Sequence, residues 1–552
     1  MRVVDLPVPG PPALAAIARD IVDITAAVDP STAANAGLFD DAIRVPDYRP
    51  AAVAALTARI DRDLAALRAL PWRTYPIDVQ IDHRWLYATA ETARRQLVNE
   101  RLFEHRPAQW LEPLGNDLIA LVSYAPERVE LQRRLFALIP AMTGQIPAIA
   151  TRPTKRDVAT AIKLADALIT MARQNGSPEA IQAAAALATY VATLRALTPS
   201  VEFEVVGKIN YAWRLRHAAL LPWTPDELLA EAHAALAAVD VQLAELTALT
   251  AGTPPLDAAA STSPAQLDAA RALTRDGLLA LYDTVEASLR AATLTGNWVS
   301  IPGAVGPIHA RETPDALVPL TGDGGSMMPP PTYVSSNIAY WNVEHFHSDW
   351  SEAERLAKVK SAQGFADNRL GPYAAHEGYP GHHLQLSIAR QNQDPLRSVL
   401  VDPVQNEGWG LYAEEALWAH GGLGKGDAAR DAVLRSYRFR IARVIYDVNI
   451  ERGDWDLQRG ADFKHRAAPG KGVIDEDVLR AIQWPTQLIC YFAGKLQIVR
   501  LRDELKQRQG PRFDERAFHD ALLAEGSVPL ALVRAKILGE PLPDLPGAGE
   551  ER

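Results

Sequence analysis

Residues 374–385 read Ala374-Ala375-His376-Glu377-Gly378-Tyr379-Pro380-Gly381-His382-His383-Leu384-Gln385 and are rich in groups that bind metal ions. Three of the 13 histidines in the chain lie within eight positions here, and a glutamate directly follows the first of them. Neutral imidazoles beside a carboxylate are typical ligands of Zn²⁺, and a glutamate that is not a ligand can accept a proton from metal-bound water. This stretch predicts a zinc hydrolase with one metal ion.

The histidines are spaced more widely than in the short zinc motif, where two histidines stand four residues apart on one helix face. His382 and His383 follow His376 by six and seven residues. Seven residues of regular helix span ~10 Å, which is too far for both rings to reach one ion. Pro380-Gly381 can bulge or kink a helix, so we expect a distortion here that shortens the span. The alternative is a plain turn between two helices, which leaves the adjacent glutamate unexplained.

A third metal ligand is expected from a second helix. Glu407 lies 25 residues after His382, and we expect it to open a helix that runs antiparallel to the first and presents its carboxylate to the ion. Glu414 lies two turns further along the same face and is expected to orient a ligand as a hydrogen-bond acceptor. A solvated surface acid is the alternative for Glu414. The spacing leaves open which of His382 and His383 binds the metal.

Composition and charge narrow the possible partners. The 552 residues include 57 Lys and Arg and 67 Asp and Glu, a net charge of −10, without a concentrated basic stripe, so no nucleic-acid partner is expected. Cys490 is the only cysteine, which excludes an intrachain disulfide framework and a cysteine-rich zinc site. Histidine and carboxylate must therefore hold any metal.

Prolines and Asp5 interrupt the apolar core of a signal peptide, and no run approaches the ~20 apolar residues of a membrane span, so we expect a soluble, cytoplasmic protein.

The first half of the chain is expected to be helical. From Pro12 to about residue 300 the sequence is rich in Ala and Leu, and its apolar positions repeat at helical spacing. Ser177-Pro178-Glu179 and Thr224-Pro225-Asp226-Glu227 have the pattern of helix starts, and residues 52–70 and 274–292 continue the same periodicity. The isolated His83 and His217 are interpreted as structural groups.

Four regions are expected along the chain: a helical region 1–300, a Pro- and Gly-rich junction or active-site loop 301–336, a catalytic zinc-binding region 337–540 and a C-terminal tail 541–552.

Residues 337–343 are rich in aromatic and β-branched side chains and predict a strand ahead of the histidines. Through Tyr340 and Asn342 this strand could be the edge along which a peptide substrate pairs, and an ordinary hairpin strand is the alternative. His345 and His347 lie close by, outside the main cluster.

The histidine stretch and residues 407–414 (Glu-Gly-Trp-Gly-Leu-Tyr-Ala-Glu) together resemble the "domain of unknown function 885" family, bacterial proteins placed by similarity among the gluzincin zinc metallopeptidases. The resemblance continues through residues 443–447, Trp455 and residues 485–496, and covers about the C-terminal 40 per cent of the chain by motif. It implies a mainly α, gluzincin-like fold with a small β-sheet beside the active-site helix.

The resemblance also implies roles for individual residues. His376, one histidine of the pair and Glu407 would bind zinc, with Glu377 as general base. Gluzincins often have glycine before the second histidine ligand, which favours His382, with His383 as the alternative.

Further residues have expected roles in the mechanism or around the site. Tyr491 is the expected donor to the tetrahedral oxyanion, because a tyrosine from a late helix does this in similar peptidases. Tyr379 is a weaker candidate, and Arg443 is expected to bind a substrate carboxylate through its planar fork. Asp447, like Glu414, is expected to lie behind the metal ligands and to orient one of them. Glu451 stands where the family pattern suggests histidine, which puts a substrate contact at that position in doubt.

These observations predict a zinc-dependent metallopeptidase, such as a carboxypeptidase of small peptides. One alternative is a metal-dependent amidase or tailoring enzyme acting on a small non-peptide amide, which a closed pocket instead of a groove along residues 339–342 would favour. A second is a non-catalytic helical binding protein with a degenerate metal site. A serine hydrolase is disfavoured because the chain has no Gly-x-Ser-x-Gly sequence.

Overall fold

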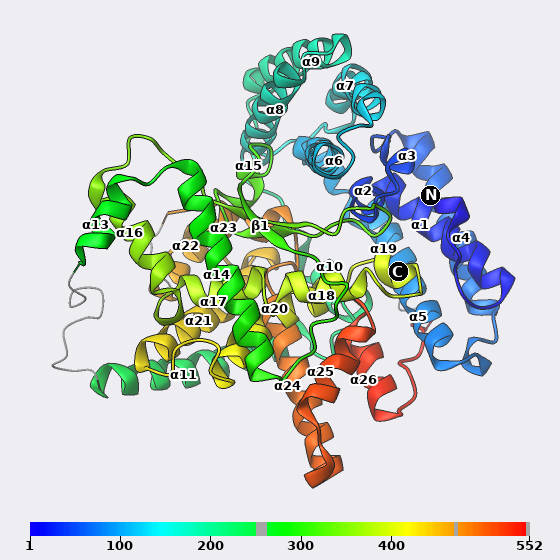
Figure 1. The fold of residues 1–552 in the computed structure, drawn as a ribbon. Helices are drawn as coiled ribbons and strands as arrows, with labels where there is room; N and C mark the ends of the chain where they lie inside the picture. Colours follow the sequence, from blue (N-terminus) through cyan, green and yellow to red (C-terminus); the bar gives the residue numbers. More distant parts are fainter. Residues whose placement is uncertain (250–261, 468–472, 548–552) are drawn as a thin grey trace.

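The computed structural model describes residues 1–249, 262–467 and 473–547. These residues are mainly helical and include a small three-stranded sheet, as the sequence predicts (Figure 1). The helices of the first half are α1 (Pro12–Val28), α2 (Ser31–Ala36), α3 (Phe39–Ala42), α4 (Pro50–Ala69), α5 (Ile77–Arg95), α6 (Leu111–Tyr124), α7 (Val129–Ile149), α8 (Lys155–Asn175), α9 (Pro178–Ala196), α10 (Gly207–Trp213) and α11 (Pro225–Leu249).

The second half contains further helices and all three strands of the sheet. They are α13 (Pro264–Arg271), α14 (Arg275–Gly296), β1 (Ile308–Glu312), α15 (Val318–Thr321), β2 (Ser326–Met328), β3 (Ala339–Val343), α16 (Glu352–Gln363), α17 (Leu370–Glu377), α18 (His382–Ala389), α19 (Leu396–Val399), α20 (Pro403–Ala419), α21 (Asp427–Glu451), α22 (Leu457–Ala467), α23 (Glu476–Gln483), α24 (Cys490–Gln509), α25 (Glu515–Ala524) and α26 (Leu530–Leu538).

Local capping explains several helix starts. The hydroxyl of Ser177 accepts a hydrogen bond from the backbone N–H of Ala180 at the start of α9. Thr224 and Glu227 cap α11 reciprocally: each side chain accepts from the backbone N–H of the other residue. Both predicted starts are confirmed, because these caps use only neighbouring residues.

The sheet has the strand order β1-β3-β2, with β1 parallel and β2 antiparallel to β3. The predicted strand is β3, but the expectation that it forms an edge is wrong, because both of its sides are paired. The side chain of Asn342 is buried and bonded to Arg311 and Ser326. The ring of Tyr340 lies 4.3 Å from the guanidinium of Arg311. Asn342 and Tyr340 thus contact side chains of the neighbouring strands, and a peptide cannot pair along β3.

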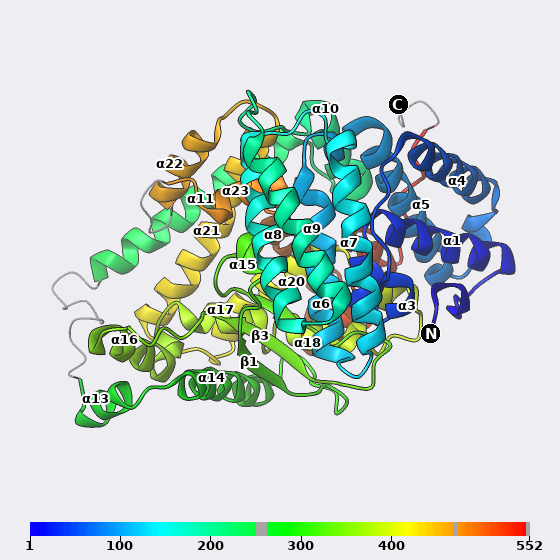
Figure 2. The same cartoon turned by 90° about the horizontal axis from the view of Figure 1, so that it is seen from above.

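Helices surround the centre of the molecule on all sides. Figures 1 and 2 show α6–α9 as a layer on one side, and α24–α26 lie on the opposite side in Figure 1. α14 packs against β1 and α17, while α20 packs along α24 and also contacts α17, α18 and α21. The helices that carry the histidine stretch and Glu407 are therefore central, and helices from distant parts of the chain hold them in place.

The largest cluster of buried apolar side chains extends from Val3 to Leu542, on both sides of the predicted boundaries at residues 300 and 336, and a smaller cluster includes Tyr446 and Val478. The described part of the predicted tail is packed, since Leu542 is buried and its carbonyl accepts a hydrogen bond from Arg73. Residues 548–552 of that tail lie outside the described residues. Among the described residues, no helix is both long and apolar enough to cross a membrane.

Candidate metal centre

The histidine stretch forms two helices joined by a four-residue turn. His376 and Glu377 are the last residues of α17, and His382 is the first residue of α18. The Tyr379–Pro380 peptide bond in the turn is cis. The expected bulge is in fact a complete break, and it brings the ring centroids of His376 and His382 to within 4.6 Å. The plain-turn alternative is thus correct for the backbone, and the turn itself brings the two imidazoles together.

Two glycines make this turn possible. A Cβ atom at Gly381 would lie 2.1 Å from the carbonyl oxygen of His376, and one at Gly378 would lie 1.8 Å from the carboxylate of Glu286 on α14. Trp409 on α20 donates a hydrogen bond of 2.9 Å to the carbonyl of Pro380. The turn is therefore closed against α17, α14 and α20. A larger side chain at Gly381 would overlap backbone atoms, and one at Gly378 would displace the Glu286 carboxylate.

Glycines also bring α20 close to its neighbours. The helix begins at Pro403, four residues before Glu407, and Asp402 caps it by accepting from the N–H of Gln405. A Cβ at Gly408 would lie 2.5 Å from the Cα of Gly494 on α24, and one at Gly410 would lie 2.6 Å from the His376 ring. The Glu-Gly-Trp-Gly sequence therefore lets the backbone of α20 pass directly beside the histidine.

His376, His382 and Glu407 form a compact cluster whose possible ligand atoms all lie within 4.8 Å of one another. Nε2 of His376 is 3.4 Å and Nε2 of His382 is 3.2 Å from the same carboxylate oxygen of Glu407. Zinc bonds of about 2.0–2.1 Å in tetrahedral geometry place ligand atoms about 3.3 Å apart. The residues present therefore fit a zinc ion with three protein ligands and one open position.

The buried carboxylate of Glu414 contacts the ring nitrogen of His376 that does not face Glu407. Nδ1 of His376 lies 2.9 Å from Glu414, whose other oxygen accepts a hydrogen bond of 2.5 Å from Ser436. Glu414 is 1 % exposed, which excludes the surface-acid alternative. Burial alone would lower the pKa of His376, but Glu407 and Glu414 outweigh it and raise that pKa to about 10. The negative charges of these carboxylates therefore favour a cation at this position.

His383 points away from the cluster. Its Nε2 lies 2.9 Å from the carbonyl oxygen of Gly306 and 3.1 Å from the hydroxyl of Tyr379. Burial lowers the pKa of His383 to about 4, so the ring is neutral. Of the two adjacent histidines, only His382 contacts Glu407. Tyr379, a candidate substrate contact from the sequence, is instead buried against His383.

Glu377 and Tyr491 lie on the open side of the cluster. Together with His376 they line a cavity of about 720 Å³. Burial raises the pKa of Glu377, and the adjacent His376 and His382 partly offset this effect. The ring of Tyr491 stacks on that of His376 with centroids 5.7 Å apart, and its hydroxyl accepts a hydrogen bond from Arg480. A proton acceptor and a hydroxyl group thus share the cavity with a metal ligand.

Gln487, Arg440 and Arg480 are site residues to which the sequence analysis gave no role, and Arg480 lines the cavity beside Tyr491. Gln487 donates to Glu407 at 3.0 Å and to the hydroxyl of Tyr491 at 3.4 Å. Arg440 lies 3.7 Å from Glu414 and lines the cavity. Arg440 lies three residues before Arg443 on α21, a spacing of one helical turn that could have indicated it, whereas Gln487 lies in the turn before α24.

Other predicted residues lie away from the cluster. Asp447 accepts a hydrogen bond of 2.6 Å from Tyr211, so it does not orient a metal ligand. Glu451 accepts from the backbone N–H of Val206 in the same buried region. His345 is bonded to Asp323. The remaining histidines of interest all contact tryptophan rings, as follows: His347 with Trp350, His83 with Trp72 and His217 with Trp213.

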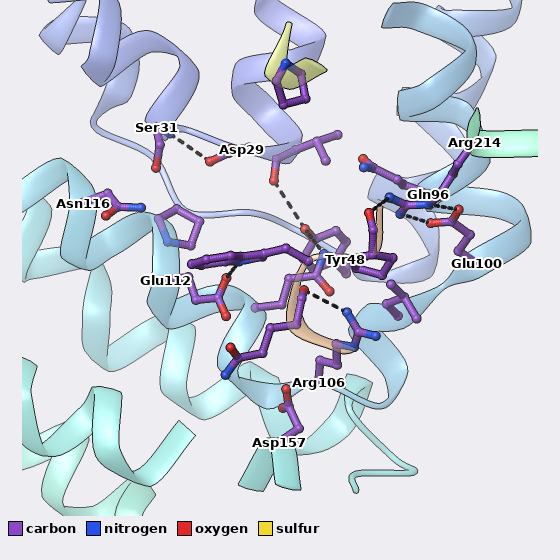
Figure 3. Close-up of a pocket in the computed structure, with 18 residues that line it drawn as sticks. Asp29, Ser31, Tyr48, Gln96, Glu100, Arg106, Glu112, Asn116, Asp157 and Arg214 are labelled. Atoms are coloured by element: carbon purple, nitrogen blue, oxygen red, sulfur yellow. Dashed lines mark hydrogen bonds and ion pairs between the residues drawn. The ribbon is translucent and has the colours of Figure 1, made fainter. Parts of the chain in front are cut away.

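A second cavity, of about 550 Å³, lies between the N-terminal helices and residues 483–485 (Figure 3). Its lining includes Glu112 and Asp157, whose pKa values burial raises to about 7, and the ion pair of Arg214 with Glu100. None of the residues predicted to form the site lines this cavity. Of these two cavities, the larger one is therefore the one that a residue of the cluster, His376, lines.

The fold and the site define a class of mainly helical proteins with a buried histidine–histidine–glutamate cluster at the centre. More specifically, the chain belongs to the family described as bacterial protein of unknown function (DUF885), whose model matches residues 30–537. No curated protein matches the chain.

Two solved structures share the fold. A predicted lipoprotein of unknown function from Shewanella oneidensis is 17% identical, with a TM-score of 0.74, over 95% of this chain and 99% of the other. A predicted lipoprotein from Colwellia psychrerythraea is 15% identical, with a TM-score of 0.71, over 96% of this chain and 99% of the other. At these identities the likeness concerns the fold alone.

Proposed function

We propose that this protein is a zinc-dependent hydrolase that cleaves amide bonds in small peptides. The observation that carries the proposal is the position of His376, His382 and Glu407 at separations suited to tetrahedral zinc, with Glu377 beside them but outside the ligand set. The motif resemblance to gluzincins supports the same reading and is our reason for proposing a gluzincin-like fold.

Each residue of the cavity has a chemical role in this proposal. When bound, Zn²⁺ acts as a Lewis acid and lowers the pKa of a water molecule to about 7. Glu377 accepts the proton from that water, and the raised pKa of its buried carboxyl suits it to pass the proton to the leaving amine. The hydroxyl of Tyr491 donates to the oxyanion that develops on the substrate carbonyl. Arg480 holds that hydroxyl in place.

The test combines metal analysis with the variant Glu377→Gln, which keeps the size of the side chain and removes its basicity. We expect one zinc per chain in both proteins and a loss of hydrolysis of about 10²-fold or more in the variant. Full activity in the variant would refute Glu377 as the base. Activity in metal-free protein would refute the metal site, and failure to bind zinc would favour the non-catalytic binding protein.

A second candidate function is hydrolysis of a small non-peptide amide. It is favoured because β3 is the central strand of the sheet, paired on both sides, and because His376 and Glu377 line a cavity of about 720 Å³. Peptides blocked at either terminus and small aryl or alkyl amides should be compared with zinc added back. Turnover of the small amides alone would select this second candidate.

A further inference from the structure

Three arginines lie around Tyr491 and line the same cavity as His376. Arg440 and Arg443 lie on α21, and Arg480 lies on α23. The guanidinium carbons of Arg443 and Arg440 are 4.8 Å and 5.9 Å from the centroid of the Tyr491 ring. Nη2 of Arg480 is 3.2 Å from its hydroxyl. The three positive charges therefore converge on one wall of the cavity.

This wall has too few carboxylates to neutralise its arginines. Asp477 pairs with Arg443 at 2.5 Å, but it also lies 3.4 Å from Lys464. Glu414 lies 3.7 Å from Arg440, and its closer partner is His376. Both acids are thus already shared with other cationic or hydrogen-bonding groups.

The protein uses only some of the hydrogen-bond donors of these arginines. Nη1 of Arg440 donates to Ser436 at 3.0 Å, and Nη2 of Arg480 donates to Gln487 at 2.8 Å. The ring of Phe439 lies 4.5 Å from the guanidinium carbon of Arg443 and 5.5 Å from that of Arg440, and a ring face accepts no strong hydrogen bond. In the part of the chain that the structure describes, Nε of each of the three arginines is buried without a partner. Arg443 is only 7 % exposed. A buried guanidinium with unused donors is costly unless an anion pairs with it.

We propose that Arg440, Arg443 and Arg480 bind a carboxylate of the substrate, so that the hydrolase prefers amides that carry a carboxylate near the bond to be cleaved. The proposal rests on the proposed function for the reaction itself. A planar guanidinium matches a carboxylate through two parallel hydrogen bonds, which a neutral amide cannot reproduce.

Geometry limits how far this carboxylate lies from the cleaved bond. The centroid of the Tyr491 ring is 5.7 Å from that of the His376 ring and 4.8 Å from the guanidinium carbon of Arg443. The His376 ring and the Arg443 guanidinium therefore lie within about 11 Å of each other. An extended chain covers about 3.3–3.6 Å per residue. The bound carboxylate therefore lies within about three residues of the metal. It is either the carboxyl terminus of a short peptide or the side chain of an acidic residue.

Two sets of matched peptides distinguish these sources with the zinc-loaded, full-length protein. The first pair is N-acetylated tetra-alanine and its C-terminal carboxamide. The second pair is two peptide carboxamides that differ only by Glu or Gln at one position. In one of these pairs, we expect kcat/KM to be at least tenfold higher for the peptide that carries the carboxylate. Cleavage of both members of both pairs at equal rates would overturn the carboxylate site and leave the proposed function standing.

Binding to Glu377→Gln separates the two proposals if no peptide is cleaved. Calorimetry with the same peptides should show at least tenfold tighter binding of the carboxylate form to this zinc-loaded variant. Tighter binding without hydrolysis by the unmodified protein would refute the proposed function and retain the anion site. Equal binding of both forms would refute the anion site.

A matched pair of variants tests the arginines themselves. Arg443→Gln should abolish the discrimination between carboxylate and carboxamide, chiefly through KM, and Arg443→Lys should restore part of it. Arg435→Gln is the control, because Arg435 lines the same cavity from the same helix but is paired with Asp431 at 2.6 Å. Equal loss of discrimination in Arg435→Gln would show a general effect of charge and overturn the assigned site.

Discussion

At the scale of single residues, the group at one nitrogen of an imidazole decides where the other nitrogen points. Nδ1 of His376 is bonded to Glu414, which directs Nε2 toward Glu407. Nε2 of His383 is bonded to the carbonyl of Gly306, outside the cluster. Neighbouring residues on a helix point about 100° apart, so His382 and His383 cannot serve the same ion.

We predict opposite results for phenylalanine at the two adjacent histidines. His382→Phe should lose zinc because a ligand is removed, and it should keep most of its stability. His383→Phe should keep zinc but lose about 1–3 kcal/mol of stability, because the buried carbonyl of Gly306 loses its shorter hydrogen bond of 2.9 Å and keeps only the one of 3.3 Å from the hydroxyl of Tyr379. Zinc content and urea unfolding measure the two effects. Zinc retained in His382→Phe and lost in His383→Phe would contradict the ligand assignment.

Glu414→Gln should weaken zinc binding by about 10- to 100-fold, because the group behind a histidine ligand sets the orientation and basicity of the ring. The variant keeps an oxygen that can accept from Nδ1 of His376 and removes only the charge. Glu415→Gln is the matched control, since Glu415 pairs with Lys495 at 2.7 Å and does not contact His376. Competition with a chelator at pH 7 measures both affinities, and equal values would argue against the role of Glu414.

At the scale of elements, the site depends on how closely four helices approach one another. α17 and α18 meet at the turn of residues 378–381, and α20 passes between them and α24 with glycines at its contacts. The glycines at these contacts lack a Cβ that would overlap the neighbouring helix. They therefore set the distance between metal ligands that come from different helices.

Gly410→Ala should therefore weaken zinc binding by about tenfold or more and cost about 1–3 kcal/mol, because its Cβ would lie 2.6 Å from the His376 ring. Gly144→Ala, inside α7, is the control, since no atom lies within 4 Å of its Cβ position. We expect this change to stabilise the protein by about 0.5–1 kcal/mol. Thermal unfolding and zinc titration test both, and unchanged zinc affinity in Gly410→Ala would refute the predicted crowding.

At the scale of the whole molecule, buried polar groups connect distant parts of the largest core. His519 on α25 is fully buried. Its Nε2 accepts a hydrogen bond of 2.7 Å from the hydroxyl of Tyr412 on α20, and its Nδ1 donates one of 2.8 Å to the carbonyl of Trp298 after α14. Burial lowers the pKa of His519 to about 4. The folded protein therefore holds this imidazole neutral, whereas the unfolded chain titrates near 6.5.

This difference predicts a loss of stability in acid. Below pH 6.5 the unfolded chain binds the proton more readily, so the contribution of His519 is complete above pH 6.5 and is lost as the pH falls toward 4. The loss is at most about 3 kcal/mol. Urea unfolding from pH 8 to pH 4 with a chelator present should show a shallower decline for His519→Gln than for the unmodified protein. Identical slopes would show that another group dominates.

The amino-acid sequence by itself determined the local features of this protein. Helix starts such as Thr224 with Glu227 follow from contacts within one turn, and the candidates His376, Glu377, Glu407 and Glu414 stand out through residue type and spacing. Family membership also follows from the sequence, since the match extends over residues 30–537. Each of these depends on interactions between residues close together in the chain or on a pattern that can be compared directly.

Tertiary structure alone decided which side chains meet. In the folded chain, His382 contacts Glu407 whereas His383 contacts Gly306, and β3 is paired on both sides. Asp447 is hydrogen-bonded to Tyr211, and Arg440 and Arg480 line the same cavity. The physical reason is that the direction of a side chain on a helix or strand depends on the element packed against it, and those elements are far away in sequence. A single rotation of ~100° about a helix moves a histidine from the metal cluster into the core.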